Sequence, residues 1–275
     1  MTISKGTNSK VPRILATDLD GTLIPLPNNS ENTQDLKKIA RHINLGKNIF
    51  IFATGRPFKS TLEALEIYAL PKPHWLICDV GASIYSNLDG EFKKHTPYET
   101  YLRSITKKLN RNNIELLLSD IPHINLQTPE NQTEFKISYR CETSSLERAL
   151  QNIRTKLCNS ELPFDCLGSV DPFENCGLID ILPKGIHKSA ALNWLAQDAQ
   201  FETDEIVYSG DSGNDYAALT FGYRSILVSN ASDTLAARVE TALQESGLSD
   251  HLFKATKEAT SGVLEGWRHF GVING

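Results

Sequence analysis

The chain has 275 residues, of which 40% are hydrophobic and 22% are charged, with a formal net charge of -5. This length allows one large domain or two modest ones, and the composition is ordinary for a globular protein. The acidic balance without a basic stripe argues against nucleic-acid binding, and no apolar run approaches the ~20 residues of a membrane helix. We therefore expect neither nucleic acid nor membrane as a partner.

The termini and cysteines point to the cytoplasm. Residues 1–13 are polar and lack the hydrophobic region of a secretory signal. The five cysteines are odd in number, irregularly spaced and without a Cys-x-x-Cys pair, so we expect reduced, mostly buried thiols. They are Cys78, Cys141, Cys158, Cys166 and Cys176.

The first predicted unit is a strand, a helix and a second strand. The apolar run 14–17 ends in two acids and a glycine, as a strand does at the carboxyl edge of a sheet. Residues 31–45 carry apolar side chains at helical spacing, with Ser30 as N-cap and Gly46 as stop. The run 48–53 is then a buried parallel strand, which completes a βαβ unit.

The remaining elements follow two patterns. A helix over 57–68 and a strand over 74–78 continue the alternation, which returns late in the chain. There we expect helices over 188–199, 215–221, 232–243 and 262–270, and strands over 205–208 and 225–228. Between these regions, 135–141 alternates in residue type, as in an antiparallel strand with one wet face. A helix over 144–157 and strands over 164–170 and 176–182 follow it.

These patterns predict an α/β fold with a doubly wound, Rossmann-like parallel sheet and an inserted α+β segment. We expect residues 1–86 and 184–275 to form the core domain. Residues 87–183 then form the insert.

Four polar clusters follow predicted strands or open a predicted helix. They are Asp18-Leu19-Asp20-Gly21-Thr22, Ala53-Thr54-Gly55-Arg56, Lys188 and the run Gly210-Asp211-Ser212-Gly213-Asn214-Asp215. Because the carboxyl ends of parallel strands meet at one edge, we expect these clusters to converge. Each is weak alone, since Asp-x-Asp is commonly a solvated turn and a lone lysine is commonly on the surface. Together they suit a phosphate bound with a divalent metal.

Mg²⁺ is the metal that this set favours, because it prefers carboxylate, water and phosphate oxygens. Asp18 and Asp211 can supply carboxylates, and Asp20 can offer its backbone carbonyl. A carboxylate can also attack phosphorus, while Thr54, the amides near Gly55 and an ammonium hold the phosphoryl oxygens.

The four clusters resemble the signatures of the haloacid dehalogenase superfamily phosphatases. The insert resembles the large α/β cap of the branch that holds Cof-type and sucrose-phosphate phosphatases. Several further segments are similar to the sucrose-phosphatase group: Trp75-Leu76-Ile77, Val80-Gly81, Ile84-Tyr85, Lys136-Ile137-Ser138-Tyr139, Asp180-Ile181-Leu182-Pro183 and Ser261-Gly262-Val263-Leu264-Glu265.

The resemblance implies a role for each site residue. Asp18 would be the nucleophile, and Asp20 the general acid and base. Thr54, Gly55, Lys188 and Asn214 would bind the phosphoryl group. Asp18, Asp20, Asp211 and Asp215 would form the Mg²⁺ site. In the cap, Lys136, Ser138 and Tyr139 could contact a polyol. The equal alternative is that they lie on an ordinary solvent-exposed face of the sheet.

One departure concerns substrate choice. Where sucrose phosphatases have an acid after Val-Gly-Ser/Thr, this chain has Ser83. Whether the chain prefers sucrose phosphate therefore stays open.

The sequence thus predicts a Mg²⁺-dependent sugar-phosphate phosphatase that works through an aspartyl-phosphate. The expected substrate is a disaccharide phosphate such as sucrose 6-phosphate or a related glycosyl-sugar phosphate, and the expected assembly is a monomer or weak dimer. The alternatives are a phosphomutase of the same superfamily and a non-catalytic phospho-receiver or sugar-phosphate sensor.

Overall fold

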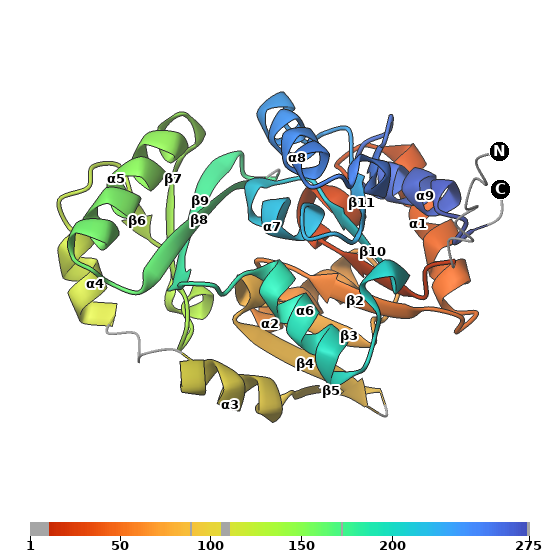
Figure 1. The fold of residues 1–275 in the computed structure, drawn as a ribbon, viewed down its shortest axis with the longest axis horizontal. Helices are drawn as coiled ribbons and strands as arrows, with labels where there is room; N and C mark the ends of the chain where they lie inside the picture. Colours follow the sequence, from red (N-terminus) through yellow and green to blue (C-terminus); the bar gives the residue numbers. More distant parts are fainter. Residues whose placement is uncertain (1–10, 89, 106–110, 172, 274–275) are drawn as a thin grey trace, which may run out of the picture.

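Two β-sheets organise the chain (Figure 1), for which a computed structural model describes residues 11–88, 90–105, 111–171 and 173–273. The larger sheet has the strand order β12-β11-β10-β1-β2-β3-β4-β5. Its parallel part consists of β1 (Ile14–Thr17), β2 (Ile49–Ala53), β3 (Trp75–Cys78), β10 (Ile206–Gly210), β11 (Arg224–Leu227) and β12 (Leu252–Lys254). An antiparallel hairpin of β4 (Ser83–Leu88) and β5 (Glu91–Lys94) extends one edge.

Helices cover both faces of this sheet, as a doubly wound fold requires. Strand side chains alternate between faces, so Leu15 and Phe50 pack on one side while Ile14 and Ile51 pack on the other. The first side is covered by α1 (Ser30–Ile43), α2 (Phe58–Ile67) and α9 (Ala259–His269). The second side is covered by α3 (Thr96–Ile105), α6 (Lys188–Asp198), α7 (Tyr216–Leu219) and α8 (Asp233–Glu245). We call this assembly the core.

The smaller sheet is antiparallel and has the order β6-β7-β9-β8. Its strands are β6 (Asn125–Leu126), β7 (Ile137–Glu142), β8 (Phe164–Asp171) and β9 (Cys176–Pro183). One face packs against α4 (Arg111–Leu118) and α5 (Leu146–Asn159) in a separate hydrophobic cluster. We call this sheet with its two helices the cap; Figure 1 shows it beside the core, in green.

The register of the central strands places the polar segments at one edge. Thr17, the last residue of β1, lies beside Phe52 of β2 and Ser209 of β10. The chain after each of these strands therefore emerges at the same edge of the sheet, on the side of the cap. This edge is where open α/β sheets bind their ligands.

The predicted fold class is confirmed, and most predicted elements lie within a few residues of those observed. The N-cap of α1 is Asn29, whose side chain accepts from the Asn32 amide; the prediction of Ser30 was wrong by one position. The sequence reading also missed β4, β5, β6, β12, α3 and α4. The expected domain boundary at residue 87 falls inside β4, which pairs with the core strand β3. We infer that the insert begins after α3, which packs on the core sheet, and ends at β9.

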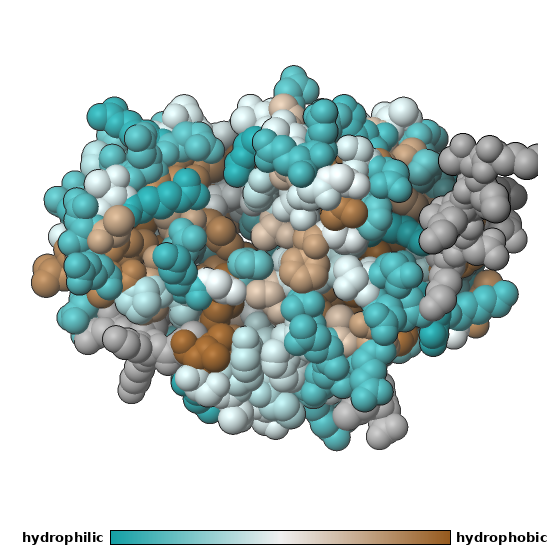
Figure 2. All heavy atoms as spheres, viewed as in Figure 1, coloured by the Kyte–Doolittle hydropathy of each residue, from teal (hydrophilic) through white to brown (hydrophobic). Residues whose placement is uncertain are grey.

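The surface is mixed in character. Figure 2 shows hydrophilic side chains over most of one face, with hydrophobic ones in smaller groups. Among the described residues, no helix is both long and apolar enough to span a bilayer. All five cysteines are free; three are buried, while Cys158 is exposed and Cys176 is half-buried.

Candidate active site

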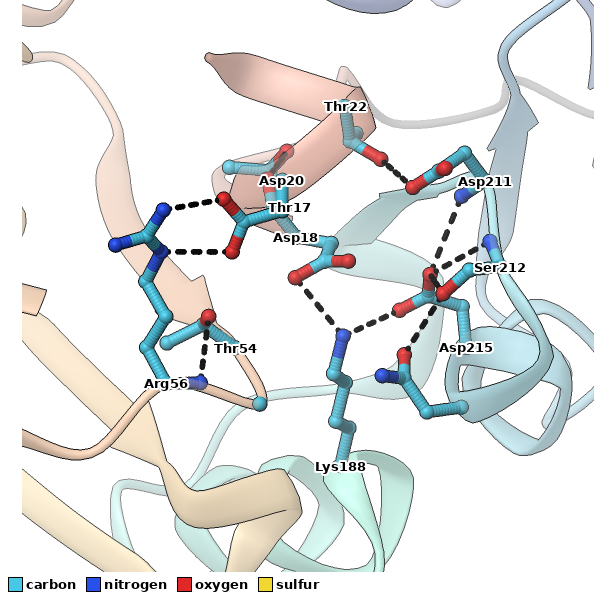
Figure 3. A network of polar contacts seen from close by, with 12 residues as sticks. Thr17, Asp18, Asp20, Thr22, Thr54, Arg56, Lys188, Asp211, Ser212 and Asp215 are labelled. Atoms are coloured by element: carbon cyan, nitrogen blue, oxygen red, sulfur yellow. Dashed lines mark hydrogen bonds and ion pairs between the residues drawn. The ribbon is translucent and has the colours of Figure 1, made fainter. Parts of the chain in front are cut away.

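A buried lysine lies at the centre of the polar clusters (Figure 3). Lys188 is the first residue of α6, and its Nζ lies 2.8 Å from Asp18 Oδ1 and 2.8 Å from Asp215 Oδ1. Its side chain is 0% exposed. Burial lowers the pKa of Lys188, but the two carboxylates outweigh burial and raise that pKa above its usual value. Three segments that are distant in the chain therefore meet around one permanent cation.

The carboxylates outnumber the cations here. Burial, followed by repulsion from Asp215, raises the pKa of Asp18 well above its usual value, although Lys188 opposes the change. Burial and Asp215 likewise raise the pKa of Asp211 to about 7. Buried carboxylates with such pKa values lack sufficient positive charge around them.

A divalent cation would supply the missing charge. Asp18, Asp211 and Asp215 each offer an oxygen within 4.8 Å of the others. This set of hard oxygen donors fits Mg²⁺.

The Asp211 carboxylate is held by the turn that follows β1. Thr22 Oγ1 donates to Asp211 Oδ1 at 2.7 Å. Gly21 has a φ of 75°, and a Cβ there would lie 2.4 Å from Asp211 Oδ2. Asn230 Nδ2 donates to the Gly21 carbonyl at 2.8 Å and so fixes the same turn. The Asp-Gly-Thr segment thus positions a carboxylate that comes from the other side of the site.

Asp215 has a different environment from the other acids. Its Oδ1 accepts from Lys188 and from the Tyr208 hydroxyl at 2.6 Å. Its Oδ2 accepts from the amides of Asp211 and Ser212 at 3.2 and 3.1 Å. Ser212 Oγ adds a longer hydrogen bond of 3.4 Å to Oδ2, so the acceptor sites of the carboxylate, about four in number, are all used. Asp215 therefore supports the loop and Lys188, while its place in the predicted metal set, with an oxygen close to those of Asp18 and Asp211, stays a prediction.

The loop after β2 carries the predicted phosphate-binding hydroxyl. Thr54 is fully buried, and its Oγ1 accepts from the Arg56 amide at 3.1 Å. The Arg56 guanidinium binds the Asp20 carboxylate through two hydrogen bonds, both 2.7 Å long. Figure 3 shows this fork beside Asp18. The sequence alone leaves open whether Arg56 is a surface charge or a neighbour of the phosphate, and the structure places it on Asp20.

Asn214 also lies at the site. Ser212 Oγ donates to Asn214 Oδ1 at 3.1 Å, and a Cβ on Gly55 would lie 3.7 Å from Asn214 Nδ2. The Asn214 amide group therefore lies near the loop of Thr54 and Gly55, and its predicted contact with the phosphoryl group stays a prediction.

A cavity of about 250 Å³ separates these groups from the cap. Its core side is lined by carboxylate, guanidinium and backbone groups, and its cap side by polar side chains of the sheet. The lining includes Asp18, Asp20, Gly55, Arg56, Asn214, Gln127, Lys136, Ser138, Arg140, Glu174 and Asp180. The cavity is thus mainly polar, and Asp18 lines it.

The three cap residues singled out from the sequence do not share one environment. Lys136 and Ser138 face the cavity but are buried, with 2% and 1% exposure, so the expected wet face is covered by the core. Tyr139 faces the other way, into the hydrophobic cluster of the cap. Because strand side chains alternate, Tyr139 cannot share a face with its two neighbours at 136 and 138. The proposed substrate contact of Tyr139 was therefore wrong.

The cap-side cations of the cavity are paired. Lys136 Nζ lies 3.5 Å from Asp79 Oδ1 and 3.7 Å from Asp180 Oδ1. Arg140 binds Glu174 at 2.8 Å. Ser83, which takes the place of the family acid, is buried outside the cavity lining and donates to Asp79 Oδ2 at 2.7 Å. Asp79 is therefore the acid next to Ser83, and its other carboxylate oxygen faces Lys136.

Comparisons with known proteins agree with this geometry. A family model described as sucrose-6F-phosphate phosphohydrolase matches residues 11–271. A protein of Nitrosococcus oceani named as a HAD-like hydrolase is 30% identical over 94% of this chain and 71% of its own length. A mannosylfructose-phosphate phosphatase of Agrobacterium fabrum is 30% identical over 94% of this chain and 97% of its own.

Solved structures show the same fold. The sucrose-phosphatase of Synechocystis sp. PCC6803, solved with sucrose and phosphate, superposes with a TM-score of 0.79. It is 22% identical, and the match covers 95% of this chain and 99% of that one. The core, the cap and their connection are therefore shared with this structure.

Proposed function

The chain belongs to the sucrose-6F-phosphate phosphohydrolase family, and from this premise we propose that it hydrolyses the phosphate ester of a glycosylated sugar. The reaction class, a sugar-phosphate phosphatase, follows from the family and from the relatives. The observation that carries the proposal for the site is the position of Lys188, 2.8 Å from Asp215 and 2.8 Å from Asp18, which lines a mainly polar cavity. Such a cation can hold the phosphoryl group next to a carboxylate nucleophile.

Asp18 is the nucleophile in this proposal. Its Oδ attacks phosphorus and forms an aspartyl-phosphate as the sugar alcohol leaves; water then releases inorganic phosphate and regenerates the carboxylate. Lys188, the Thr54 hydroxyl and the amides near Gly55 hold the phosphoryl oxygens, because phosphoryl transfer depends mainly on placement and charge neutralisation.

Mg²⁺ would be held by the carboxylates of Asp18 and Asp211, with the backbone carbonyl of Asp20 as the third protein ligand of the proposal. When bound, it would offset the negative charge of the phosphoryl group and of the two acids. The raised pKa values of Asp18 and Asp211 support this assignment, since burial and repulsion from Asp215 disfavour the charged carboxylates that a cation would stabilise.

Asp20 is the general acid and base. Its carboxyl group protonates the leaving sugar oxygen and later takes a proton from the attacking water. Arg56 fixes its orientation through the two 2.7 Å hydrogen bonds. An arginine fork of this kind sets the plane of a carboxylate and thereby the direction in which it can transfer a proton.

The substrate class follows from the charge of the cavity. On its cap side Lys136 and Arg140 are both paired with acids, so this end suits a neutral polyol. A phosphomutase must also hold the second phosphate of a bisphosphate intermediate, and these paired cations argue against it. We propose a disaccharide phosphate such as sucrose 6-phosphate or mannosylfructose phosphate, the second named by the Agrobacterium relative. The free thiols fit the proposed cytoplasmic location.

A panel of sugar phosphates tests the proposal. With Mg²⁺, we expect release of inorganic phosphate from disaccharide phosphates at a higher kcat/KM than from hexose phosphates. EDTA should abolish release, and added Mg²⁺ should restore it.

Asp18→Asn is the control for the nucleophile. It should lower kcat by at least about 10³-fold, with an unchanged or higher melting temperature because it removes a repelled buried charge. Transfer of phosphate to a second sugar hydroxyl would instead favour the mutase. Binding without turnover would favour a sensor.

A further inference from the structure

The loop of Thr54, Gly55 and Arg56 has all three of its backbone carbonyls occupied. The Thr54 carbonyl accepts from the Val80 amide at 3.0 Å, and the Arg56 carbonyl accepts from the Asp79 amide at 3.0 Å. The Gly55 carbonyl accepts from Lys136 Nζ at 3.1 Å. Two of these donors are backbone groups of the core, whereas the third is a side chain of the cap. The cap thus completes the hydrogen bonding of a loop that belongs to the core.

The hydrogen bond from Lys136 leads directly to the phosphate-binding hydroxyl. Its acceptor oxygen belongs to the peptide unit that joins Gly55 to Arg56. The N–H of this same peptide donates to Thr54 Oγ1 at 3.1 Å. Because the peptide is planar, fixing its oxygen also fixes its N–H, and linked hydrogen bonds strengthen one another. With its oxygen accepting this bond, the Thr54 hydroxyl keeps its proton free for a ligand.

One of the two acids beside Lys136 belongs to the core and the other to the cap. Asp79 Oδ1 lies 3.5 Å from Lys136 Nζ and has no hydrogen-bond partner among the described residues. Asp79 belongs to the core, whereas Asp180, 3.7 Å from the ammonium, belongs to the cap. Both ends of the Lys136–Asp79 pair are buried, so separating them would leave a poorly compensated charge on each side.

The core segment that contacts Lys136, formed by Asp79 and Val80, has an unfavourable backbone conformation. Asp79 and Val80 have φ values of 55° and 57°, in the left-handed region that β-branched residues rarely adopt. Strained backbone of this kind persists where the surroundings require it, and it gathers at functional sites. Here it directs the amides of both residues at the carbonyls of the Thr54 loop.

We propose that Lys136 is a positioning residue that makes the phosphate-binding loop depend on cap closure. The Lys136 ammonium links Asp79 to the Gly55 carbonyl and so sets the Thr54 hydroxyl only when the cap lies on the core. This role rests on the proposed function, and it differs from the sugar contact that the sequence indicates for Lys136. A sugar contact would affect only sugar substrates, whereas loop positioning affects every phosphate ligand.

The test compares Lys136→Met with Lys156→Met. Lys156 is also a cap lysine in an ion pair, 2.8 Å from Asp120, but that pair lies within the cap. Two quantities are measured with Mg²⁺ present: the Kd of inorganic phosphate by calorimetry, and kcat and KM with sucrose 6-phosphate and with 4-nitrophenyl phosphate. For Lys136→Met we expect phosphate binding weakened about 10-fold and kcat lowered about 10- to 100-fold with both esters. Lys136→Arg should recover part of both losses, and Lys156→Met should change neither.

Two results would overturn the role. One is unchanged phosphate binding with a loss confined to sucrose 6-phosphate, which would make Lys136 a sugar contact. The other is no loss at all. If Lys136→Met shows no thermal unfolding transition and therefore does not fold, phosphate binding is measured in Asp79→Asn instead. Asp79 lies outside the cavity lining, so this variant removes the partner of Lys136 without changing the cavity wall. Unchanged phosphate binding in that variant also overturns the role. Failure of the wild-type chain to hydrolyse any ester would instead count against the proposed function, because phosphate binding is measured separately.

Discussion

At the scale of single residues, Gly21 connects the turn after β1 to the opposite side of the site. A side chain there would meet Asp211, since a Cβ would lie 2.4 Å from Oδ2 and 2.9 Å from Cγ. We predict that Gly21→Ala displaces this carboxylate and adds backbone strain of roughly 1–3 kcal/mol at its positive φ. The variant should need more Mg²⁺ for half-maximal activity, which a titration of phosphate release against Mg²⁺ measures.

Gly46 provides a matched control for this prediction. Its φ of 67° is close to that of Gly21, but a Cβ there would have no neighbour within 4 Å. Gly46→Ala should therefore lower the free energy of unfolding through strain alone and leave the Mg²⁺ requirement as it is. An equal rise in that requirement in both variants would mean that contact with Asp211 is not the reason for Gly21.

Arg56 is the residue whose two hydrogen bonds orient Asp20. We predict that Arg56→Lys, which keeps the charge but loses the fork, lowers kcat with a sugar phosphate about 10- to 100-fold. The loss should be smaller with 4-nitrophenyl phosphate, because 4-nitrophenolate leaves without needing a proton. The measurement is the ratio of the two losses in kcat.

Arg103→Lys is the control for Arg56→Lys. Arg103 binds Glu134 through a similar fork, with distances of 3.0 and 2.8 Å, on the exposed surface. This variant should leave both kcat values unchanged. Equal losses with the two substrates in Arg56→Lys would show that Arg56 acts on the phosphate loop and not through Asp20.

At the scale of elements, α1 and α9 are joined by a carboxylate whose charge stabilises the fold. Burial raises the pKa of Asp35, but hydrogen bonds from Lys38 and Ser261 outweigh it and lower that pKa below its usual value. A lowered acid pKa stabilises the folded state above the unfolded-state pKa, and this stability is lost as pH falls through the folded-state pKa. Asp35→Asn should therefore lower the melting temperature at pH 7 by a few degrees, and the difference should shrink below about pH 4.

Asp120 offers the comparison for this effect. Its pKa is also lowered by a lysine hydrogen bond, from Lys156, but the carboxyl group is exposed to solvent. Solvent screens such a pair, so Asp120→Asn should hardly change the melting temperature at either pH. A difference for Asp35→Asn that does not vary with pH would mean that its packing, not its charge, matters.

The elements that the sequence predicts best are those with strong hydrophobic periodicity. β1, α6 and α8 carry their apolar residues at clear spacing, and each lies within two residues of its expected range. The sequence does not predict the hairpin of β4 and β5 because both strands mix polar and apolar residues and neither has a long apolar run. β5 is also exposed at three of its four positions. Its pairing with β3 is a tertiary contact, which local propensity does not encode.

The site shows the same division. Asp18, Thr54, Lys188 and Asp211 could be placed together from sequence because each follows a strand or opens a helix at one sheet edge. The environment of each of these side chains could not be predicted from the sequence. The strand 137–142 alternates as expected, but only the structure shows that the face of Ser138 is covered by the core. Hydrogen-bond saturation at Asp215 likewise depends on Tyr208 and on loop amides.

At the scale of the whole molecule, the cap touches the core at contacts spread around the cavity. Lys136 reaches the Gly55 carbonyl, and a Cβ on Gly213 would lie 2.5 Å from the Gly168 carbonyl oxygen. Phe173, in the turn between β8 and β9, stacks on Tyr68 just after α2. The cavity is therefore closed by several small contacts, and Leu167 and Leu182 of the cap sheet also pack against a hydrophobic cluster of the core. Such an interface allows opening for substrate entry and product release.

The stack of Phe173 on Tyr68 tests whether these contacts control closure. The ring centroids are 6.2 Å apart with an interplanar angle of 25°, and a pair of this kind contributes roughly 0.5–1.5 kcal/mol. Phe173→Ala should thus shift the closure equilibrium up to about 10-fold toward the open form and lower kcat/KM for a sugar phosphate by a similar factor. The radius of gyration in solution should rise slightly, while the melting temperature should fall only a little because the ring is half-buried at the margin of one hydrophobic cluster.

Phe221→Ala separates closure from the general loss of an aromatic ring. Phe221 also stacks on a tyrosine, Tyr223, at 4.7 Å, but both residues belong to the core. This variant should leave kcat/KM and the radius of gyration unchanged, and Phe173→Tyr should restore most of the activity lost in Phe173→Ala. A loss of kcat/KM in Phe173→Ala without any change in the radius of gyration would place the ring in substrate binding. The closed arrangement would then depend on Lys136 and the glycine contact rather than on the turn of the cap.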